Sequence, residues 1–196
     1  MIKLLEKIDA LENVLKTRDE ALKQANRSLM KKDYLIDCLE QRLSNTRIND
    51  DLTGLYNRNH LYSKFKELLE MQNRLGHRIV LGVFDIQNFS QVNHKYGIEF
   101  GDAILMSFGK VSRHLIRNHV DMTFRLGDDE FVIVMVDCNY KNGLRVCERI
   151  KHQFKKVTNG IELEFGLVEL KKDGKRLLGD YLEHARNNLN KKIQIG

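Results

Sequence analysis

Four acidic residues have a spacing that could place their carboxylates around a cation. Asp85 ends the apolar segment 78–86 (RIVLGVFDI), which indicates a buried strand whose last side chain emerges at the edge of a sheet. Asp128, Asp129 and Glu130 crowd three carboxylates into one tight turn, where their mutual repulsion is unfavourable unless a cation or solvent relieves it. Mg²⁺ is commonly held in proteins by one or two carboxylates together with substrate phosphates. One acid from each segment could therefore hold a metal ion and a triphosphate.

Each of the two acidic segments also has a simpler interpretation. An aspartate between a strand and a helix commonly caps that helix, and Asp85 taken alone favours this role. The residues 127–130 taken alone could form an acidic type I′ turn, because they are good turn formers. The neighbouring sequence has to decide between a metal site and these two structural roles.

The segments that would position the acids alternate between strand and helix patterns. A helix is predicted over about 58–75, ending at Gly76, and the strand at 78–86 follows it. The later segments are helices at about 88–96 and 99–117, strands at about 122–126 and 130–136 joined as a hairpin, a helix at about 140–156, a strand at about 161–170 and a helix at about 175–192. From residue 78 the order β-α-α-β-β-α-β-α predicts an α+β fold with a mixed sheet flanked by helices, of the split-βαβ kind.

Residues 1–48 contain no glycine or proline and carry a heptad pattern. With position a at Ile8, the later a positions are all apolar: Leu15, Leu22, Leu29, Ile36 and Leu43. This unbroken series indicates a long coiled-coil helix, whereas a single amphipathic helix lying on its own domain would show a broader stripe. Arg18 and Lys32 occupy d positions, which favours a parallel dimer over a larger bundle. The expected organisation is a dimerisation stalk at 1–48 and a globular domain at 49–196.

Composition limits the classes of partner. No apolar run approaches the ~20 residues needed to cross a bilayer, so we expect a cytoplasmic protein that makes no membrane contact. The formal charge of +6 could attract a nucleotide or nucleic acid, or could simply be solvated lysine. Basic residues are not interleaved with aromatics along a stripe, so nucleic-acid binding is not expected. The three cysteines lack metal-ligand spacing and are expected to be reduced thiols.

Four segments resemble, in order, the motifs of GGDEF domains, the diguanylate cyclases. Residues 50–58 (DDLTGLYNR) resemble the opening D-x-L-T-G-L-x-N-R, and residues 84–89 (FDIQNF) resemble the D-I-D-x-F segment. Residues 93–102 (NHKYGIEFGD) resemble N-D-x-x-G-H-x-x-G-D, and residues 125–131 (RLGDDEF) resemble R-x-G-G-D/E-E-F. The resemblance covers about residues 49–170 and implies a GGDEF/nucleotidyl-cyclase-like fold.

The resemblance also implies a reaction. Members of this family join two GTP molecules into cyclic di-GMP and release pyrophosphate, with one GTP bound to each of two facing domains. It implies two Mg²⁺ ions per site, held by Asp85, Asp129 and the carbonyl of Ile86. A homodimer through a parallel coiled coil would raise the local concentration of the facing domain. The stalk would also offer a surface to a regulatory protein.

Other roles carried over from the family concern the nucleotide. Glu130 would lie beside the attacking 3′-hydroxyl as a base or positioning group, next to Asp129 as the second catalytic acid. The groups expected to bind GTP are Asn93 and Asp102 at the guanine edge, backbone amides around Asn88 and Phe89 at the phosphates, Asp128 close to the triphosphate and Lys191 as a phosphate-binding cation.

The sequence departs from the family pattern at several of these positions. Asp128 replaces the second glycine of the signature, Gln87 replaces the second acid of D-I-D, and Ile98 replaces a histidine. Asp121 holds the aspartate place of the product-inhibition motif R-x-x-D, but Asn118 holds the arginine place, so a product-inhibition site is expected to be absent. Arg117 is one residue away from that place.

Two functions are therefore open. One is a diguanylate cyclase without feedback inhibition, which the metal-binding acids, Glu130 and both guanine contacts favour. The other is a catalytically weak or inactive domain that serves as a dimeric module for GTP binding or protein interaction. Asp128 and the departures from the family pattern at residues 185–193 favour this alternative.

Overall fold

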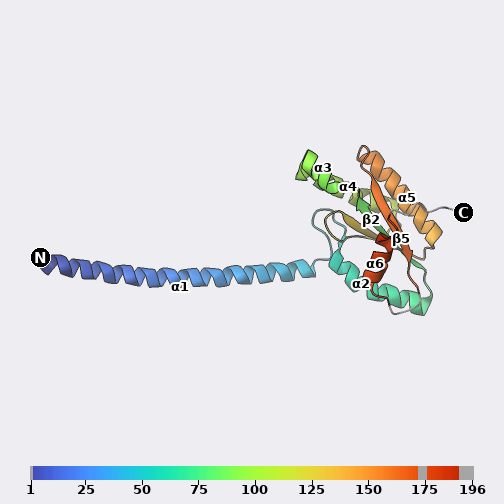
Figure 1. Ribbon diagram of the computed structural model, residues 1–196. Coiled ribbons are helices and arrows are strands. Elements are labelled where there is room, and N and C mark those ends of the chain that lie inside the picture. Colours follow the sequence, from blue (N-terminus) through green and yellow to red (C-terminus); the bar gives the residue numbers. More distant parts are fainter. Residues whose placement is uncertain (1, 172–175, 190–196) are drawn as a thin grey trace. The chain divides into compact units, whose positions relative to one another are not determined.

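The computed structural model describes residues 2–171 and 176–189 and divides the chain into two compact units, Met1–Arg47 and Ile48–Gly196 (Figure 1). The first unit is a single continuous helix, α1 (Ile2–Thr46). Along residues 15–36 of α1 the apolar a positions Leu15, Leu22, Leu29 and Ile36 are 51–60% exposed. A stripe of exposed leucine on a long helix is the surface that a second helix would cover in a coiled coil.

The second unit is built on a five-stranded sheet. In spatial order its strands are β1 (Tyr56–Asn57), β3 (Met122–Arg125), β4 (Glu130–Val136), β2 (Ile79–Ile86) and β5 (Leu163–Glu169). β1 and β3 are parallel, and every other neighbouring pair is antiparallel. The sheet is therefore mixed, and β4 separates β2 from β3, which confirms the predicted split arrangement.

Helices cover both faces of this sheet. The pair α4 (Ile98–Leu115) and α5 (Tyr140–Val157) packs on one face, where the ring of Phe108 stacks on Phe131 with centroids 4.0 Å apart. The pair α2 (Arg58–Glu70) and α6 (Leu178–Arg186) packs on the other face. Because successive residues of a strand point to opposite faces, Phe84 enters the first layer and Val83 the second. Asp85 therefore points to the α2/α6 face.

The predicted helices and strands are confirmed, with small shifts at their ends. The helix α2 continues through one π-helical turn, Met71–Leu75, and ends at Gly76, whose φ of 76° suits glycine. The short helix α3 (Phe89–Tyr96) precedes α4 as expected. The sequence did not predict β1, because two residues are too few to show a strand pattern.

The last helix is shorter than the predicted range 175–192. The helix α6 begins after Leu177, whose N–H donates to the Asp180 carboxylate at 2.9 Å, and a turn at 187–189 follows its end. The carboxylate of Asp180 binds one of the N–H groups that the first turn of a helix leaves unpaired. The predicted phosphate-binding Lys191 lies outside the described residues.

The acidic turn between β3 and β4 is not of type I′, so that interpretation is wrong. A type I′ turn needs positive φ at both central residues, and none of the residues 126–129 has a positive φ. The loop spans four residues, and the Leu126 N–H donates to the Glu130 carbonyl at 2.8 Å. Asp128 therefore does not occupy a backbone conformation that favours glycine.

Among the described residues, no helix combines the length and apolar character needed to cross a membrane.

Candidate active site at the acidic edge of the sheet

Three carboxylates form a row across adjacent strands at one end of the sheet. Asp85 of β2 is in register with Glu130 of β4 on one side and with Glu164 of β5 on the other. Directly opposed residues of antiparallel strands point to the same face, with Cβ atoms about 5 Å apart. Asp129 joins the row from the loop that precedes β4. The structure thus brings together the predicted acids and adds Glu164, which was not predicted.

Burial and the neighbouring acids change the protonation of Asp85 and Asp129. Burial raises the pKa of Asp85 to about 6, and the charges of Asp129, Glu130 and Glu164 act in the same direction. Burial also raises the pKa of Asp129, with Asp128 and Glu130 contributing. A divalent cation would relieve this repulsion and would favour the charged forms.

The donor set fits Mg²⁺. Carboxylates of Asp85 and Asp129 with the carbonyl of Ile86 are hard oxygen ligands, and Mg²⁺ normally completes such a set with water and substrate phosphates. Within the described part of the chain no three His, Cys, Asp or Glu side chains already enclose a metal position. An open donor set of this kind suits an ion that is bound together with its nucleotide.

A cation that sequence reasoning missed lies beside the acids. Arg186, at the end of α6, donates to both carboxylate oxygens of Glu130, from Nε at 2.5 Å and from Nη2 at 2.8 Å. This planar, two-bond geometry is the strong form of an arginine–carboxylate pair. The helix reaches this position because β5 carries Gly166 under it, where a Cβ would lie 2.0 Å from the Ala185 carbonyl oxygen. Glycine at 166 was the available signal for this close approach.

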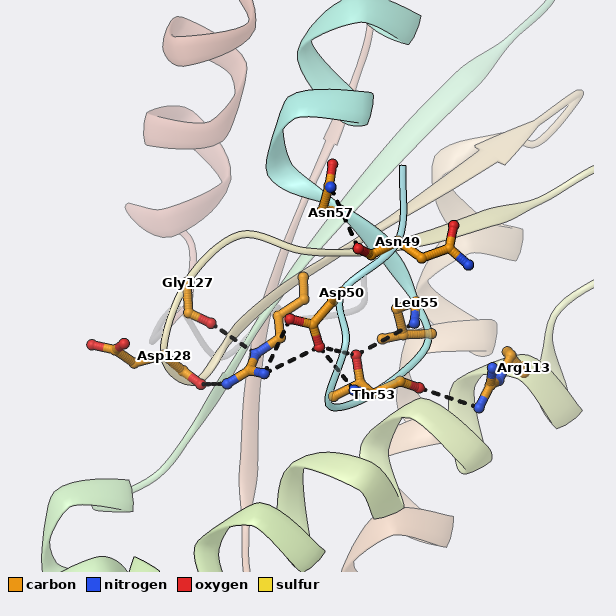
Figure 2. Close-up of polar contacts among 9 residues, drawn as sticks. Asn49, Asp50, Thr53, Leu55, Asn57, Arg113, Gly127 and Asp128 are labelled. Carbon is orange, nitrogen blue, oxygen red and sulfur yellow. Dashed lines mark hydrogen bonds and ion pairs between the residues drawn. The ribbon is translucent and has the colours of Figure 1, made fainter. Parts of the chain in front are cut away.

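Arg125 ties the acidic hairpin to the motif at residues 50–58 (Figure 2). Its Nη1 lies 3.1 and 3.3 Å from the two carboxylate oxygens of Asp50, and it donates to the carbonyls of Gly127 at 3.0 Å and Asp128 at 2.8 Å. Asp50 also accepts from the Thr53 N–H at 2.8 Å and the Thr53 hydroxyl at 2.6 Å. The carboxylate of Asp128 points away from Asp50 (Figure 2). The contacts of Arg125 therefore fix the hairpin backbone without using the carboxylate of Asp128.

The turn after β2 does not use Asp85 as a helix cap, so that interpretation is wrong. The N-cap of α3 is Asn88, in the left-handed region at φ 55°, and its side chain makes no capping hydrogen bond. The Gln87 N–H donates to the Glu162 carbonyl at 3.0 Å, which fixes the turn to β5. The first N–H groups of a helix such as α3 have no partner inside the helix, so a phosphate can accept from them around Phe89.

The predicted guanine contacts lie close together on α3 and α4. The side chain of Asn93 packs against Gly101, where a Cβ would lie 1.8 Å from the Asn93 Oδ1, and Asp102 follows directly. The Asn93 Oδ1 is buried and has no hydrogen-bond partner in the described structure. Buried polar atoms are normally satisfied, but this oxygen is packed against Gly101 and is not open to a ligand in this conformation. The guanine contacts of Asn93 and Asp102 therefore stay a prediction.

An internal ion pair occupies the region of the product-inhibition motif. Arg117 binds both oxygens of Asp121, with Nε at 2.9 Å and Nη2 at 2.5 Å, and its backbone N–H donates to the same carboxylate at 3.0 Å. The Asp121 carboxylate is thus already engaged by its own chain. The absence of tight product binding there stays a prediction.

The mixed sheet and its flanking helices have the architecture of a nucleotidyl-cyclase-like domain. Residues 47–196 match the family described as "Diguanylate cyclase, GGDEF domain". The chain belongs to the GGDEF family.

A diguanylate cyclase is among the relatives that this chain matches. The diguanylate cyclase DgcS of Shewanella oneidensis is 39% identical over 110 residues, which cover 56% of this chain and 36% of DgcS. The match thus covers about a third of the length of this relative.

Two solved structures share the fold. The coiled coil and GGDEF domain of DgcB from Caulobacter crescentus, in complex with c-di-GMP, has a TM-score of 0.68 at 20% identity and covers 85% of this chain and 90% of that one. The second is diguanylate cyclase SiaD in complex with its activator SiaC, from Pseudomonas aeruginosa. It has a TM-score of 0.65 at 22% identity, and the match covers 94% of this chain and 72% of that one. At this level of identity the likeness shows the fold alone.

Proposed function

We propose that this protein is a diguanylate cyclase, which condenses two GTP molecules into cyclic di-GMP and releases pyrophosphate. The observation that carries the proposal is the convergence of Asp85, Asp129 and Glu130 at one edge of a GGDEF-family sheet. The turn at 86–89 and the pair Asn93 and Asp102 lie on the elements that follow β2. The proposal assigns these groups to the metal, the phosphates and the base.

The metal chemistry belongs to the bound nucleotide complex. Asp85, Asp129 and the Ile86 carbonyl are the groups that would hold two Mg²⁺ ions. When bound, these ions orient the triphosphate and offset charge on the leaving pyrophosphate. The carboxylates supply the negative charge that keeps the ions at this edge of the sheet.

Residues of the chain position the reacting groups. Glu130 accepts the proton of the 3′-hydroxyl, and the freed oxygen attacks the α-phosphorus of the GTP on the facing domain. The bond between the α-phosphorus and the bridging oxygen breaks, and pyrophosphate leaves with that oxygen. Arg186 fixes the carboxylate of Glu130 through its two hydrogen bonds. A second transfer with the roles exchanged closes the ring.

Because ring closure needs two domains, the proposal includes a homodimer through a parallel coiled coil of α1. Its support is the exposed a-position stripe on α1, and the fold is shared with the coiled coil and GGDEF domain of DgcB. A coiled coil raises the effective concentration of the partner domain. The SiaD–SiaC complex supports a regulatory protein as a further partner, and we propose that it binds the stalk. We also propose that the reaction takes place in the cytoplasm.

The first test is product formation. The purified protein incubated with GTP and Mg²⁺ is expected to yield cyclic di-GMP and pyrophosphate, and Asp129→Ala is expected to abolish both. Glu148→Ala, an exposed acid on α5 away from this edge, is the control and should keep full activity. A wild-type protein that binds GTP but forms no product at high concentration would refute the cyclase and leave the binding module.

The second test concerns the stalk. Leu29→Lys places a charge at an a position and is expected to lower both dimerisation and product formation. Tyr34→Lys, at an exposed f position of the same heptad pattern, should change neither. Sedimentation and activity are compared at matched concentrations. Full activity from a monomeric Leu29→Lys protein would contradict the dimer.

The third test asks whether Asp128 limits turnover. Asp128 adds a negative charge near the triphosphate, and its backbone imposes no positive φ. Asp128→Gly should therefore raise turnover several-fold by removing charge, with little change in the hairpin conformation. Unchanged turnover in Asp128→Gly would show that the departure at this position does not limit the reaction.

A further inference from the structure

Glu164 belongs to none of the motifs that define the family resemblance, yet it faces the candidate active site. It is the β5 partner of Asp85 in the sheet register, so its side chain points to the same face as that of Asp85. On the other side of Asp85 stands Glu130, which Arg186 binds with two hydrogen bonds. Asp85 is therefore the middle of three carboxylates, and Glu164 is on the side away from Glu130.

A second residue that departs from the family pattern orients Glu164. Gln87 stands where the D-I-D pattern has its second acid, and its side-chain amide donates a hydrogen bond to Glu164 Oε1. The backbone N–H of Gln87 is also bound, to the Glu162 carbonyl at 3.0 Å. An amide donor holds a carboxylate in place without neutralising its charge. The negative charge missing at position 87 is thus present at position 164, one hydrogen bond away.

We propose that Glu164 is an additional carboxylate of the metal site, oriented by Gln87, and that it strengthens the binding of the divalent cations of the cyclase. The proposal rests on the proposed function, which places these cations at Asp85 and Asp129. Opposed Cβ atoms about 5 Å apart allow Asp85 and Glu164 to reach one hydrated cation, directly or through a bound water. Glu164 would then supply, from β5, the negative charge that the family pattern places at position 87. An acid thus remains beside Asp85.

The test measures metal affinity, with Mn²⁺ as a probe for the site. Calorimetric titration of the full chain with MnCl₂ is carried out with and without a non-hydrolysable GTP analogue. Glu164→Gln keeps the shape of the side chain and should weaken Mn²⁺ binding about tenfold, as loss of an outer group at a metal site does. Glu169→Gln is the control on the same strand, where the carboxylate pairs with Arg78 on the opposite face, and should leave Mn²⁺ affinity unchanged.

A thermal unfolding measurement separates a metal role from a purely structural one. Without metal, Glu164→Gln removes repulsion from Asp85 and should raise the melting temperature or leave it unchanged. With saturating Mn²⁺, the rise in melting temperature on adding the metal should be smaller than in the wild type. A variant that melts lower without metal and gains as much from Mn²⁺ as the wild type would overturn the proposal.

Exchange of the two side chains is a positive control. The double variant Gln87→Glu with Glu164→Gln returns the charge to position 87 and should bind Mn²⁺ more tightly than Glu164→Gln alone. Wild-type Mn²⁺ affinity in Glu164→Gln, or an equal loss in Glu169→Gln, would refute the role of Glu164. These outcomes are independent of turnover: a wild type that forms no cyclic dinucleotide but binds Mn²⁺ through Glu164 would refute the cyclase and keep the metal-site assignment.

Discussion

Arg125 reaches both carboxylate oxygens of Asp50, at 3.1 and 3.3 Å, although 75 residues separate them along the chain. The same guanidinium donates to the carbonyls of Gly127 and Asp128 in the acidic loop. One side chain therefore holds the position of the hairpin backbone relative to the turn that begins the second unit. Since Asp129 and Glu130 follow directly, their placement depends on the contacts that Arg125 makes.

Arg125→Lys should loosen this loop. Lysine has a single ammonium group and cannot reproduce the fork that binds Asp50 and both carbonyls. We expect the free energy of unfolding of the second unit to fall by about 1–2 kcal/mol in urea titrations and product formation to fall by roughly tenfold (ΔΔG‡ of about 1.4 kcal/mol). Arg78→Lys, in an exposed pair with Glu169, should cost less than about 0.5 kcal/mol. Equal effects of the two substitutions would contradict the positioning role of Arg125.

Asp50 should give this contact a defined pH dependence. Burial opposes the charged form, but the hydrogen bonds from Thr53 and the Arg125 guanidinium prevail and lower the pKa of Asp50 below its ordinary value of 3.8. A carboxyl with a lowered folded-state pKa stabilises the fold above its unfolded pKa, and this stability is lost as the pH falls through the folded pKa. Asp50→Asn should therefore be less stable than wild type at pH 7 and at pH 5, by similar amounts. The gap should narrow below about pH 4, and a gap that is constant down to pH 2.5 would argue against an ionised Asp50.

Gly101→Ala should weaken guanine binding without unfolding the domain. A Cβ at this position would lie 1.8 Å from the Asn93 Oδ1 and 3.2 Å from the Phe89 ring, so the Asn93 side chain must move. Asn93 is a group that we propose binds the guanine edge, so its displacement should weaken binding of a GTP analogue about tenfold and reduce discrimination against ATP. Gly179→Ala is the matched control in a helix, because a Cβ there meets nothing within 4 Å. It should bind the analogue normally and gain up to about 1 kcal/mol of stability, and normal guanine binding in Gly101→Ala would disprove the role of Asn93.

The sequence predicted the parts of the site that are encoded locally. The apolar run before Asp85 and the hairpin around residues 127–130 gave the strands β2 and β4, and the family motifs indicated that their acids meet. It did not predict Glu164 or Arg186, because their positions depend on strand register and on how closely a helix packs over Gly166. Register is set by the whole pattern of buried residues and by distant turns, so no short spacing in the chain links Glu164 to Asp85.

Local patterns also produced two wrong interpretations. Asp85 has the residue type of a helix cap, but the chain continues for three residues before α3 begins, and Asn88 takes the N-cap position. The acidic turn contains residues suited to type I′, but the loop is longer than the two residues that this turn requires. In both cases composition was compatible with the interpretation and the length of the connection was not.

Arg186 is expected to control both Glu130 and the affinity for the triphosphate. Arg186→Gln removes the charge and one of the two bonds to Glu130, which leaves a carboxylate beside the incoming phosphates without its bound cation. Because the pair is partly exposed, with 45% and 23% of the two side chains accessible, the stability of the fold should change by less than about 1 kcal/mol. Binding of a magnesium–GTP analogue should weaken about tenfold at low salt and by less at high salt, since salt screens exposed charges.

Arg145→Gln on α5, which packs on the opposite face of the sheet, should bind the analogue normally at both salt concentrations. Arg186→Lys restores the charge without the paired hydrogen bonds, so it should recover analogue binding better than product formation. If Arg186→Gln binds and turns over GTP like the wild type, the bond to Glu130 is only structural and a different cation must serve the phosphates.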